Sequence, residues 1–262
     1  MRSDDLPLDL PVYPGESFSA LLRARNVEPR WEVPGHTSGL PISEGTTVLA
    51  FRYTGGVVMA GDRRATAGSL ITHRRVQKVF PADEFSAVAI SGTAGVALEL
   101  IRLFQTELEH YEKLEGSRLS LDGKANYLAS MLRRNLPMAF QGLIVIPLFC
   151  GFDEDAGRGR LYSFDVVGGR YEETDYAATG SGGRDASMYL RGSFRADMSE
   201  DEALRLAVEA LVVTAEEDSA TGGPDLRRDI YPNVVVVDAG GYRDIDEVRV
   251  AETSRQVMGS AP

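Results

Sequence analysis

Residues 42–51 read ISEGTTVLAF, and the chain changes character inside this stretch. A glycine, Gly45, stands directly before two threonines, Thr46 and Thr47, and an apolar run follows them. Threonine and the β-branched and aromatic residues after it favour a strand, so we expect a strand to begin at residue 46. The stretch therefore predicts where the regular fold begins. It leaves open why a flexible glycine precedes that point.

The segment before this point, residues 1–45, differs in composition from the rest. It holds six of the twelve prolines and the only tryptophan, Trp31. Only residues 17–27, SFSALLRARNV, are expected to form a short helix, because proline fixes φ and lacks an amide donor. Two interpretations stay open: a disordered tail, or a segment that acts once and is then removed.

The composition of the 262 residues argues against several classes of protein. The formal net charge of −11 is unlike that of a nucleic-acid or anionic-membrane binder. No apolar run approaches the ~18 residues of a transmembrane helix, and the N-terminus lacks the apolar core of a secretory signal. One cysteine, Cys150, excludes an internal disulfide and fits a cytoplasmic protein. Three histidines and this cysteine show no metal-ligand spacing, so we expect neither a metal nor a cofactor.

From residue 46 the pattern is regular and predicts groups of strands and groups of helices. Strands are expected at 46–53, 56–62, 70–80, 85–91, 142–151, 159–166, 170–177, 233–240 and 246–252. Amphipathic helices are expected at 94–114, 120–136, 183–193 and 200–217. Strands in runs and helices in pairs favour an α+β fold over βαβ alternation. We therefore expect a four-layer αββα sandwich, in which two antiparallel sheets pack face to face with helices outside.

Several residues are candidates for chemistry, each with a structural alternative. Cys150 lies in an apolar run without a nearby base and is expected to be a buried, inert thiol. Ser181 lies in ATGSGGRD, 178–185, which could cradle phosphate but lacks the lysine of a Walker loop and the dinucleotide fingerprint. Residues 218–225, DSATGGPD, read as a helix exit and a turn.

Two charged residues, Asp62 and Lys78, are harder to assign to the surface. Asp62 ends the second expected strand, and apolar neighbours carry Lys78 toward the interior. They could form an ordinary surface salt bridge. If both are buried they must pair, because an unpaired buried charge costs several kcal/mol. A buried lysine beside a hydroxyl favours the alkoxide, or lets an amine stay neutral.

Taken in order, these motifs resemble a proteasome β subunit of the actinobacterial kind. The resemblance runs from Gly45 to about residue 250 and rests on GTTVLAF, GVVMAGDRRAT, KVF, AISGTAG, ATGSGG and DSATGG. That family belongs to the N-terminal nucleophile hydrolases, whose αββα sandwich agrees with the expected layers. The resemblance implies a threonine-type endopeptidase that degrades unfolded proteins in an enclosed chamber.

The resemblance also implies a role for each matching residue. Thr46 is the expected nucleophile, freed by autocatalytic cleavage of the Gly45–Thr46 bond; residues 1–45 are then a propeptide and 46–262 the catalytic domain. The freed α-amine of Thr46, with an ordinary pKa near ~8, is the expected base. The other catalytic residues that it implies are Asp62, Lys78, Ser181, Asp218 and Gly92, the last through its backbone N–H. Arg64 and Thr221 are supporting residues, and Thr221 stands where the family often has serine.

Substrate-binding residues follow from the same resemblance. Thr66 and Ala94 are expected to pair with the substrate backbone as an added strand. Val76, Ile90 and Ala94 are expected to line the pocket for the residue before the cut. All three are apolar, which favours cleavage after hydrophobic residues. Thr47 is given only the structural role of beginning the strand.

The resemblance implies partners as well, and three alternatives remain beside it. The implied partners are proteasome α subunits, copies of this chain in heptameric rings stacked as α7β7β7α7, a ring-shaped ATPase and protein substrates that carry a small ubiquitin-like tag. The alternatives are a non-catalytic ring subunit, a two-ring threonine peptidase without α partners, and an unrelated phosphate-binding enzyme. The complete set of Thr46, Asp62 and Lys78 favours the catalytic interpretation, because inactive members lose one of them.

Overall fold

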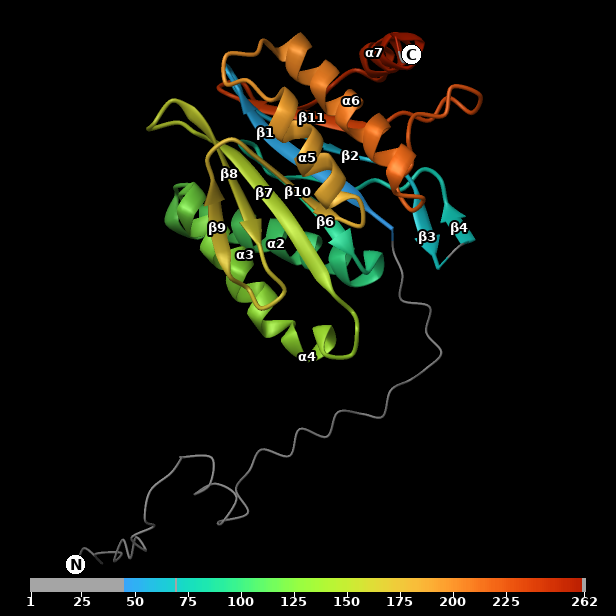
Figure 1. The fold of residues 1–262 in the computed structure, drawn as a ribbon. Helices are drawn as coiled ribbons and strands as arrows, with labels where there is room; N and C mark the ends of the chain where they lie inside the picture. Colours follow the sequence, from blue (N-terminus) through green and yellow to red (C-terminus); the bar gives the residue numbers. More distant parts are fainter. Residues whose placement is uncertain (1–44, 69, 261–262) are drawn as a thin grey trace, which may run out of the picture. The chain divides into compact units, whose positions relative to one another are not determined.

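Two five-stranded antiparallel sheets form the centre of the part that the structure, a computed structural model, describes: residues 45–68 and 70–260 (Figure 1). The helix expected at 17–27 lies outside the described residues. The first sheet has the order β10-β1-β2-β11-β12 and the second β5-β6-β7-β8-β9. A separate two-stranded sheet pairs β3 with β4.

The strands of the first sheet are β1 (Thr47–Tyr53), β2 (Gly56–Gly61), β10 (Tyr176–Gly180), β11 (Asn233–Asp238) and β12 (Gly241–Asp244). Those of the second are β5 (Val79–Asp83), β6 (Ser86–Gly92), β7 (Val145–Asp153), β8 (Arg158–Phe164) and β9 (Arg170–Glu173). The short pair is β3 (Ala65–Ala67) and β4 (Leu70–His73). The helices are α2 (Ala94–Glu115), α3 (Leu121–Arg134), α4 (Leu136–Ala139), α5 (Gly183–Ser193), α6 (Glu200–Glu217) and α7 (Glu247–Ser260).

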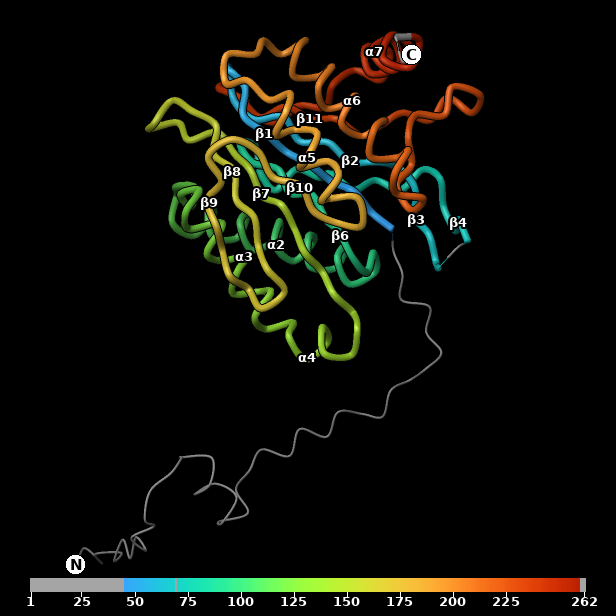
Figure 2. Tube along the Cα trace, viewed as in Figure 1, coloured from blue at the N-terminus to red at the C-terminus, as the bar shows by residue number. Residues whose placement is uncertain are grey.

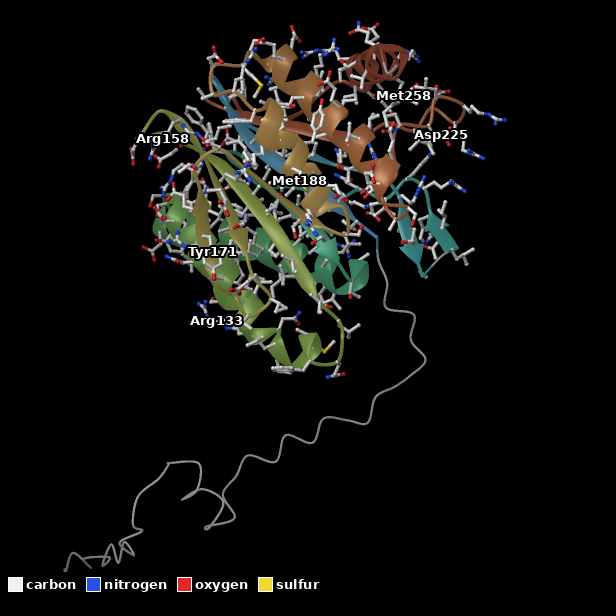
Figure 3. All side chains as sticks on the ribbon, viewed as in Figure 1. Arg133, Arg158, Tyr171, Met188, Asp225 and Met258 are labelled. Atoms are coloured by element: carbon white, nitrogen blue, oxygen red, sulfur yellow. The ribbon has the colours of Figure 1, made fainter. Side chains whose placement is uncertain are left out.

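Three hydrophobic cores separate four layers, which confirms the expected αββα sandwich. Side chains of the first sheet pack with those of α5, α6 and α7 in one core. Side chains of the second sheet pack with α2 and α3 in another, and a third core lies between the two sheets. Exposed apolar side chains such as Met188 on α5 and Tyr171 on β9 lie outside these cores (Figure 3).

The alternation of side chains along each strand explains why both faces of the sheets are apolar. In β1, Leu49 and Phe51 face the helices while Val48 and Ala50 face the other sheet. Successive side chains of a strand point to opposite faces, so a sheet covered on both sides needs an unbroken apolar run. The run TVLAF therefore specifies a central strand. It is flanked by β2 and by the distant β10, as the chain trace in Figure 2 shows.

Local sequence fixes the starts of two of the predicted helices. Ser120 caps α3, where its hydroxyl accepts a hydrogen bond from the N–H of Gly123 at 3.2 Å. Ser199 and Glu202 form a capping box at the start of α6. These caps satisfy amide groups that have no partner within the helix.

One predicted element is wrong: residues 246–252, expected as a strand, form the first part of α7. The side chain of Asp246 accepts the N–H of Val248 at 2.7 Å and so caps the helix. The buried residues Val250, Ala251, Ser254 and Val257 follow helical spacing, which a seven-residue window was too short to reveal. The strand that ends the first sheet is β12, which was not predicted.

Two other predicted strands are each divided between sheets. Residues 70–80 contain β4 of the short pair and the start of β5 in the second sheet. Residues 170–177 contain β9 of the second sheet and the start of β10 in the first. Propensity favours a strand in both windows but does not say which neighbour a strand pairs with. The strand β3 and the single turn α4 were not predicted either.

Candidate active site

Thr46 lies immediately before β1, where segments from three parts of the chain meet. It is buried, and its carbonyl oxygen accepts the N–H of Ser181 at 2.9 Å. On the other side, the N–H of Gly45 donates to Oγ1 of Thr66 at 3.0 Å. The residues expected at the cleavage site are therefore held inside the protein, between β3 and the loop after β10.

Gly45 fits this position because it has no side chain. A Cβ atom there would lie 2.1 Å from the Cβ of Ala220 and 2.6 Å from Oγ1 of Thr66. Real Cβ atoms do not approach other atoms so closely, and part of the obstruction is backbone of residue 220. Close packing thus explains the glycine that precedes the two threonines.

Asp62 and Lys78 form a buried ion pair beside Thr46, which confirms the buried alternative. Nζ of Lys78 lies 2.5 Å from Oδ1 of Asp62, and both side chains are excluded from solvent. Asp62 also accepts three backbone N–H groups, from Thr47 at 2.9 Å, Arg64 at 2.8 Å and Gly222 at 2.9 Å. Together with Lys78, these three N–H groups supply four donors to the two oxygens of the carboxylate.

Lys78 is held by two acceptors. Besides Asp62, its ammonium donates to the carbonyl oxygen of Arg64 at 2.6 Å. Burial lowers the pKa of Lys78 below its ordinary value, and the neighbouring Asp62 opposes this effect without cancelling it. An ammonium has three protons, so two described acceptors leave one proton for a further group.

A second cluster surrounds Asp218 at the end of α6. Its Oδ2 accepts the hydroxyl of Ser181 at 2.5 Å and that of Thr221 at 2.6 Å, and its Oδ1 accepts the N–H of Ala220 at 3.0 Å. Burial raises the pKa of Asp218, but the donors, led by Ser181 and then Thr221, outweigh it and hold the pKa below its usual range. The cluster therefore keeps a negative charge next to Thr46.

The remaining predicted residues are only partly brought together. Gly92 ends β6 opposite Val145, with a φ of 101° that favours glycine. Val76 lines a hollow of about 630 Å³ with residues 72–75, Arg228 and Ile230. Ile90 instead packs in the core with α2 and α3, and Ala94 begins α2. The hollow that Val76 lines thus includes neither of them.

Sequence reasoning missed two residues of the site. Gly222 donates its N–H to Asp62, and Thr47 shares its hydroxyl with Thr221 at 2.6 Å. Gly222 belongs to the motif DSATGG, so the motif was a signal, but no role was assigned to its glycine. The pairing of Thr47 with Thr221 spans 174 residues and leaves no local signal.

Other candidates have no site in the described part of the chain. Cys150 is buried, and burial raises the pKa of its thiol well above the ordinary value, which agrees with an inert role. Across residues 45–68 and 70–260, no group of three or more His, Cys, Asp or Glu side chains could hold a metal ion. None of the described helices combines the length and apolar character needed to cross a membrane.

Comparison with known proteins agrees with this geometry. The sequence profile of the family described as "Proteasome subunit" matches residues 42–225. A "Proteasome subunit beta" of Acidimicrobium ferrooxidans is 52% identical over 258 residues, which cover 96% of this chain and 94% of that protein. Those of Frankia casuarinae and Streptomyces griseus are 56% and 51% identical, over 80% and 86% of this chain and 79% and 83% of theirs. The chain therefore belongs to the proteasome subunit family, as a β subunit of the core particle.

Proposed function

We propose that this β subunit carries the endopeptidase activity of its particle itself, with Thr46 as the nucleophile. The observation that carries the proposal is the buried pair of Lys78 and Asp62, whose carboxylate also binds the N–H of Thr47, the residue next to Thr46. A fixed positive charge in a dry site stabilises an alkoxide far more than it does in water. The place of this charge beside Thr46, rather than its burial alone, favours a catalytic subunit over a structural one.

The proposed activation is cleavage of the Gly45–Thr46 bond by the hydroxyl of Thr46. Its oxygen attacks the carbonyl carbon of Gly45, and an ester replaces the amide, with the proton passing to the released nitrogen. Water then hydrolyses the ester, which leaves Gly45 as a carboxylate and Thr46 as a free N-terminus. This proposal is supported by the hydrogen bonds on both sides of the scissile bond: Thr66 accepts from the N–H of Gly45, and the N–H of Ser181 donates to the carbonyl of Thr46.

In the proposed peptidase step the freed amine of Thr46 takes the proton of its own hydroxyl. The oxygen attacks the substrate carbonyl, the amine returns the proton to the leaving nitrogen, and water hydrolyses the resulting ester. Lys78 stabilises the developing charge, Asp62 holds Lys78 charged, and the N–H of Gly92 is the proposed oxyanion donor. The hydroxyl of Ser181 donates its hydrogen bond to Asp218, so the lone pairs of Ser181 can accept a hydrogen bond from the amine.

Substrate binding is proposed to use Thr66 and Ala94 along the peptide backbone. Among the described strands, β3, which contains Thr66, pairs only with the short β4. An extended peptide can add to such a strand through backbone hydrogen bonds. Val76 is the proposed contact for the side chain before the cut, with Ile90 and Ala94 as further contacts. The apolar character of all three favours cleavage after hydrophobic residues.

The family assembles into a proteasome, and we propose the finer arrangement for this chain. Its partners are α subunits and copies of itself, in heptameric rings stacked as α7β7β7α7. A ring-shaped ATPase then feeds tagged proteins through the α rings, in the cytoplasm. Exposed Leu103 and Leu114 on α2 support burial of that helix face against a neighbour. Native mass spectrometry of the co-expressed subunits gives the stoichiometry.

The central test measures the mature N-terminus and the activity together. The full chain is co-expressed with its α partner, and the purified particle is analysed by intact mass spectrometry and with a fluorogenic peptide. We expect a β chain that starts at Thr46. Thr46→Ala is expected to keep residues 1–45 attached and to abolish peptidase activity.

Thr253→Ala is the matched control, since Thr253 lies on α7 and its hydroxyl donates to the carbonyl of Arg249 within that helix. It is expected to behave as the wild type in both measurements. An assembled particle that cleaves peptides while its β chain still begins at Met1 would contradict the mechanism. An assembled, inactive wild-type particle would instead favour the structural ring subunit.

A further inference from the structure

Thr47 belongs to a buried chain of hydroxyl groups that joins three segments of the molecule. Its Oγ1 lies 2.6 Å from Oγ1 of Thr221, and Thr221 in turn contacts Asp218 at 2.6 Å. The N–H of Gly182 donates to Oγ1 of Thr47 at 3.0 Å. Both threonine side chains are fully buried. The chain thus links the start of β1 to the loops before α5 and after α6.

The direction of each hydrogen bond in this chain follows from counting protons. An ionised carboxylate can only accept hydrogen bonds, so Thr221 uses its single hydroxyl proton to donate a hydrogen bond to Asp218. Thr221 has no second proton, and Thr47 must therefore donate to Thr221. Oγ1 of Thr47 accepts from Gly182 in the same arrangement. The donors run in one direction, from Gly182 through Thr47 and Thr221 to Asp218.

Gly182 packs so closely against these two hydroxyls that no side chain fits at its position. It precedes α5, and its own N–H donates to Oγ1 of Thr47. A Cβ atom at this position would lie 2.7 Å from Oγ1 of Thr47 and 2.8 Å from Oγ1 of Thr221. The neighbouring Ser181 bonds the carbonyl of Thr46. The position of Ser181 is thus set from one side by Thr46 and from the other by Thr47.

We propose that Thr47 is a positioning residue of the peptidase site: its hydroxyl holds Thr221 and Gly182 so that Ser181 and Asp218 stay aligned beside Thr46. The proposal rests on the function proposed for Thr46. Thr47 does not touch the reacting atoms and acts through its neighbours. The hydroxyl chain is present while Gly45 is still joined to Thr46, so Thr47 acts in self-cleavage as well as in peptide cleavage.

The charge of Asp218 gives the proposal a distinct readout. The hydroxyl of Thr221 is one of the donors that lower the pKa of Asp218. Without a donor from Thr47, Thr221 loses its alignment, and the pKa of Asp218 rises toward its ordinary value. The acidic limb of the activity profile then moves to higher pH. A packing defect alone lowers activity without moving this limb.

The test compares Thr47→Val, which keeps the shape and removes the hydroxyl, with Thr47→Ser, which keeps the hydroxyl. Both are made in the full chain, co-expressed with the α partner. We expect Thr47→Val to slow self-cleavage and to lower kcat about 10- to 100-fold with little change in KM. We also expect it to shift the acidic limb of the pH–activity profile to higher pH. We expect Thr47→Ser to restore the wild-type pH profile and most of kcat.

Thr214→Val is the matched control. Thr214 is equally buried and lies beside Gly182, but its hydroxyl only donates to the carbonyl of Ala210 within α6. It is expected to lose stability without a shift of the acidic limb. An equal loss of kcat and an equal pH shift in Thr214→Val would overturn the proposal, as would a wild-type profile in Thr47→Val.

A second single substitution, Thr221→Val, covers the case in which Thr47→Val does not assemble. Thr221→Val cuts the same chain at its next member and is expected to shift the acidic limb likewise. Where both single variants assemble, the double variant Thr47→Val/Thr221→Val is made as well. Its loss of kcat should be no larger than that of the more affected single variant. Additive losses would overturn the proposal. An inactive, uncut wild-type chain would overturn the function of Thr46 instead, which separates the two failures.

Discussion

Three lysines of this protein each meet a carboxylate at the same distance, 2.5 Å, in three different surroundings. Lys78 with Asp62 is 2% and 0% exposed, Lys124 with Asp83 is 4% and 15% exposed, and Lys113 with Glu109 is 70% and 66% exposed. The first pair lies beside Thr46, the second joins α3 to β5, and the third lies on the surface of α2. Distance alone therefore does not identify a site.

The difference between the two buried pairs lies in what else the carboxylate binds. Asp83 accepts donors from its own turn, the hydroxyl of Ser86 and the N–H of Phe85. Asp62 accepts the N–H of its near neighbour Arg64, and also those of Thr47 and Gly222, which lie 15 and 160 residues away in the sequence. The pair at Asp83 fixes one helix to one strand. The pair at Asp62 gathers three segments around Thr46, as a catalytic centre requires.

The largest effect is expected from Lys78→Met, which removes the charge and keeps most of the volume. Peptidase activity should fall at least about 100-fold, because charge that develops on the nucleophile loses its partner. Asp62 keeps three backbone donors, so the particle should still assemble. Kinetics with a fluorogenic peptide on purified particles measure the loss. Activity within twofold of the wild type would remove Lys78 from the mechanism.

Lys124→Met should have the opposite profile. Removing one partner of a buried pair leaves Asp83 unpaired and should destabilise the subunit by about 3 kcal/mol. The activity per assembled particle should not change, because no described contact joins Lys124 or Asp83 to the site. Denaturant unfolding measures the stability, and the peptide assay supplies the comparison with Lys78→Met. A loss of activity in particles of normal stability would erase the distinction between the two pairs.

Asp218 extends the comparison to a carboxylate held by hydroxyls rather than by a lysine. Its pKa is lowered in the folded protein, so its stabilising contribution is complete above the ordinary value of about 3.9 and is lost as the pH falls below it. Asp218→Asn should lower the melting temperature most above pH about 4. The difference in melting temperature between this variant and the wild type should become smaller in more acidic solution. A difference that is constant with pH would show that the ionised form is not what the hydroxyls stabilise.

The smallest effect is expected from Lys113→Ala. The pair with Glu109 is exposed on both sides, and water and salt screen such charges. Neither the melting temperature nor the peptidase activity should change measurably. A clear loss of assembly in this variant would mean that the surface of α2 is buried in the particle, and the pair would then behave as a partly buried one.

Local pattern was sufficient for the elements whose contacts are near in sequence. The first hairpin, the four amphipathic helices, and the order of strand and helix groups all follow from periodicity. The start of α7 was missed because its helical spacing only shows over more than seven residues. Residues 70–80 and 170–177 were taken as single strands because the sheet that a strand joins depends on distant partners.

Ordered local motifs were enough to predict the layered fold and the family, and they singled out Asp62, Lys78, Ser181 and Asp218 as candidates beside Thr46. Only the tertiary structure decided that Asp62 and Lys78 are buried together, because the sequence allowed a surface pair equally well. It alone joined Thr47 to Thr221, which are 174 residues apart. A hydrogen bond depends on where two atoms meet in space, and the packing of the loop after α6 against the start of β1 leaves no trace in the pattern around either threonine.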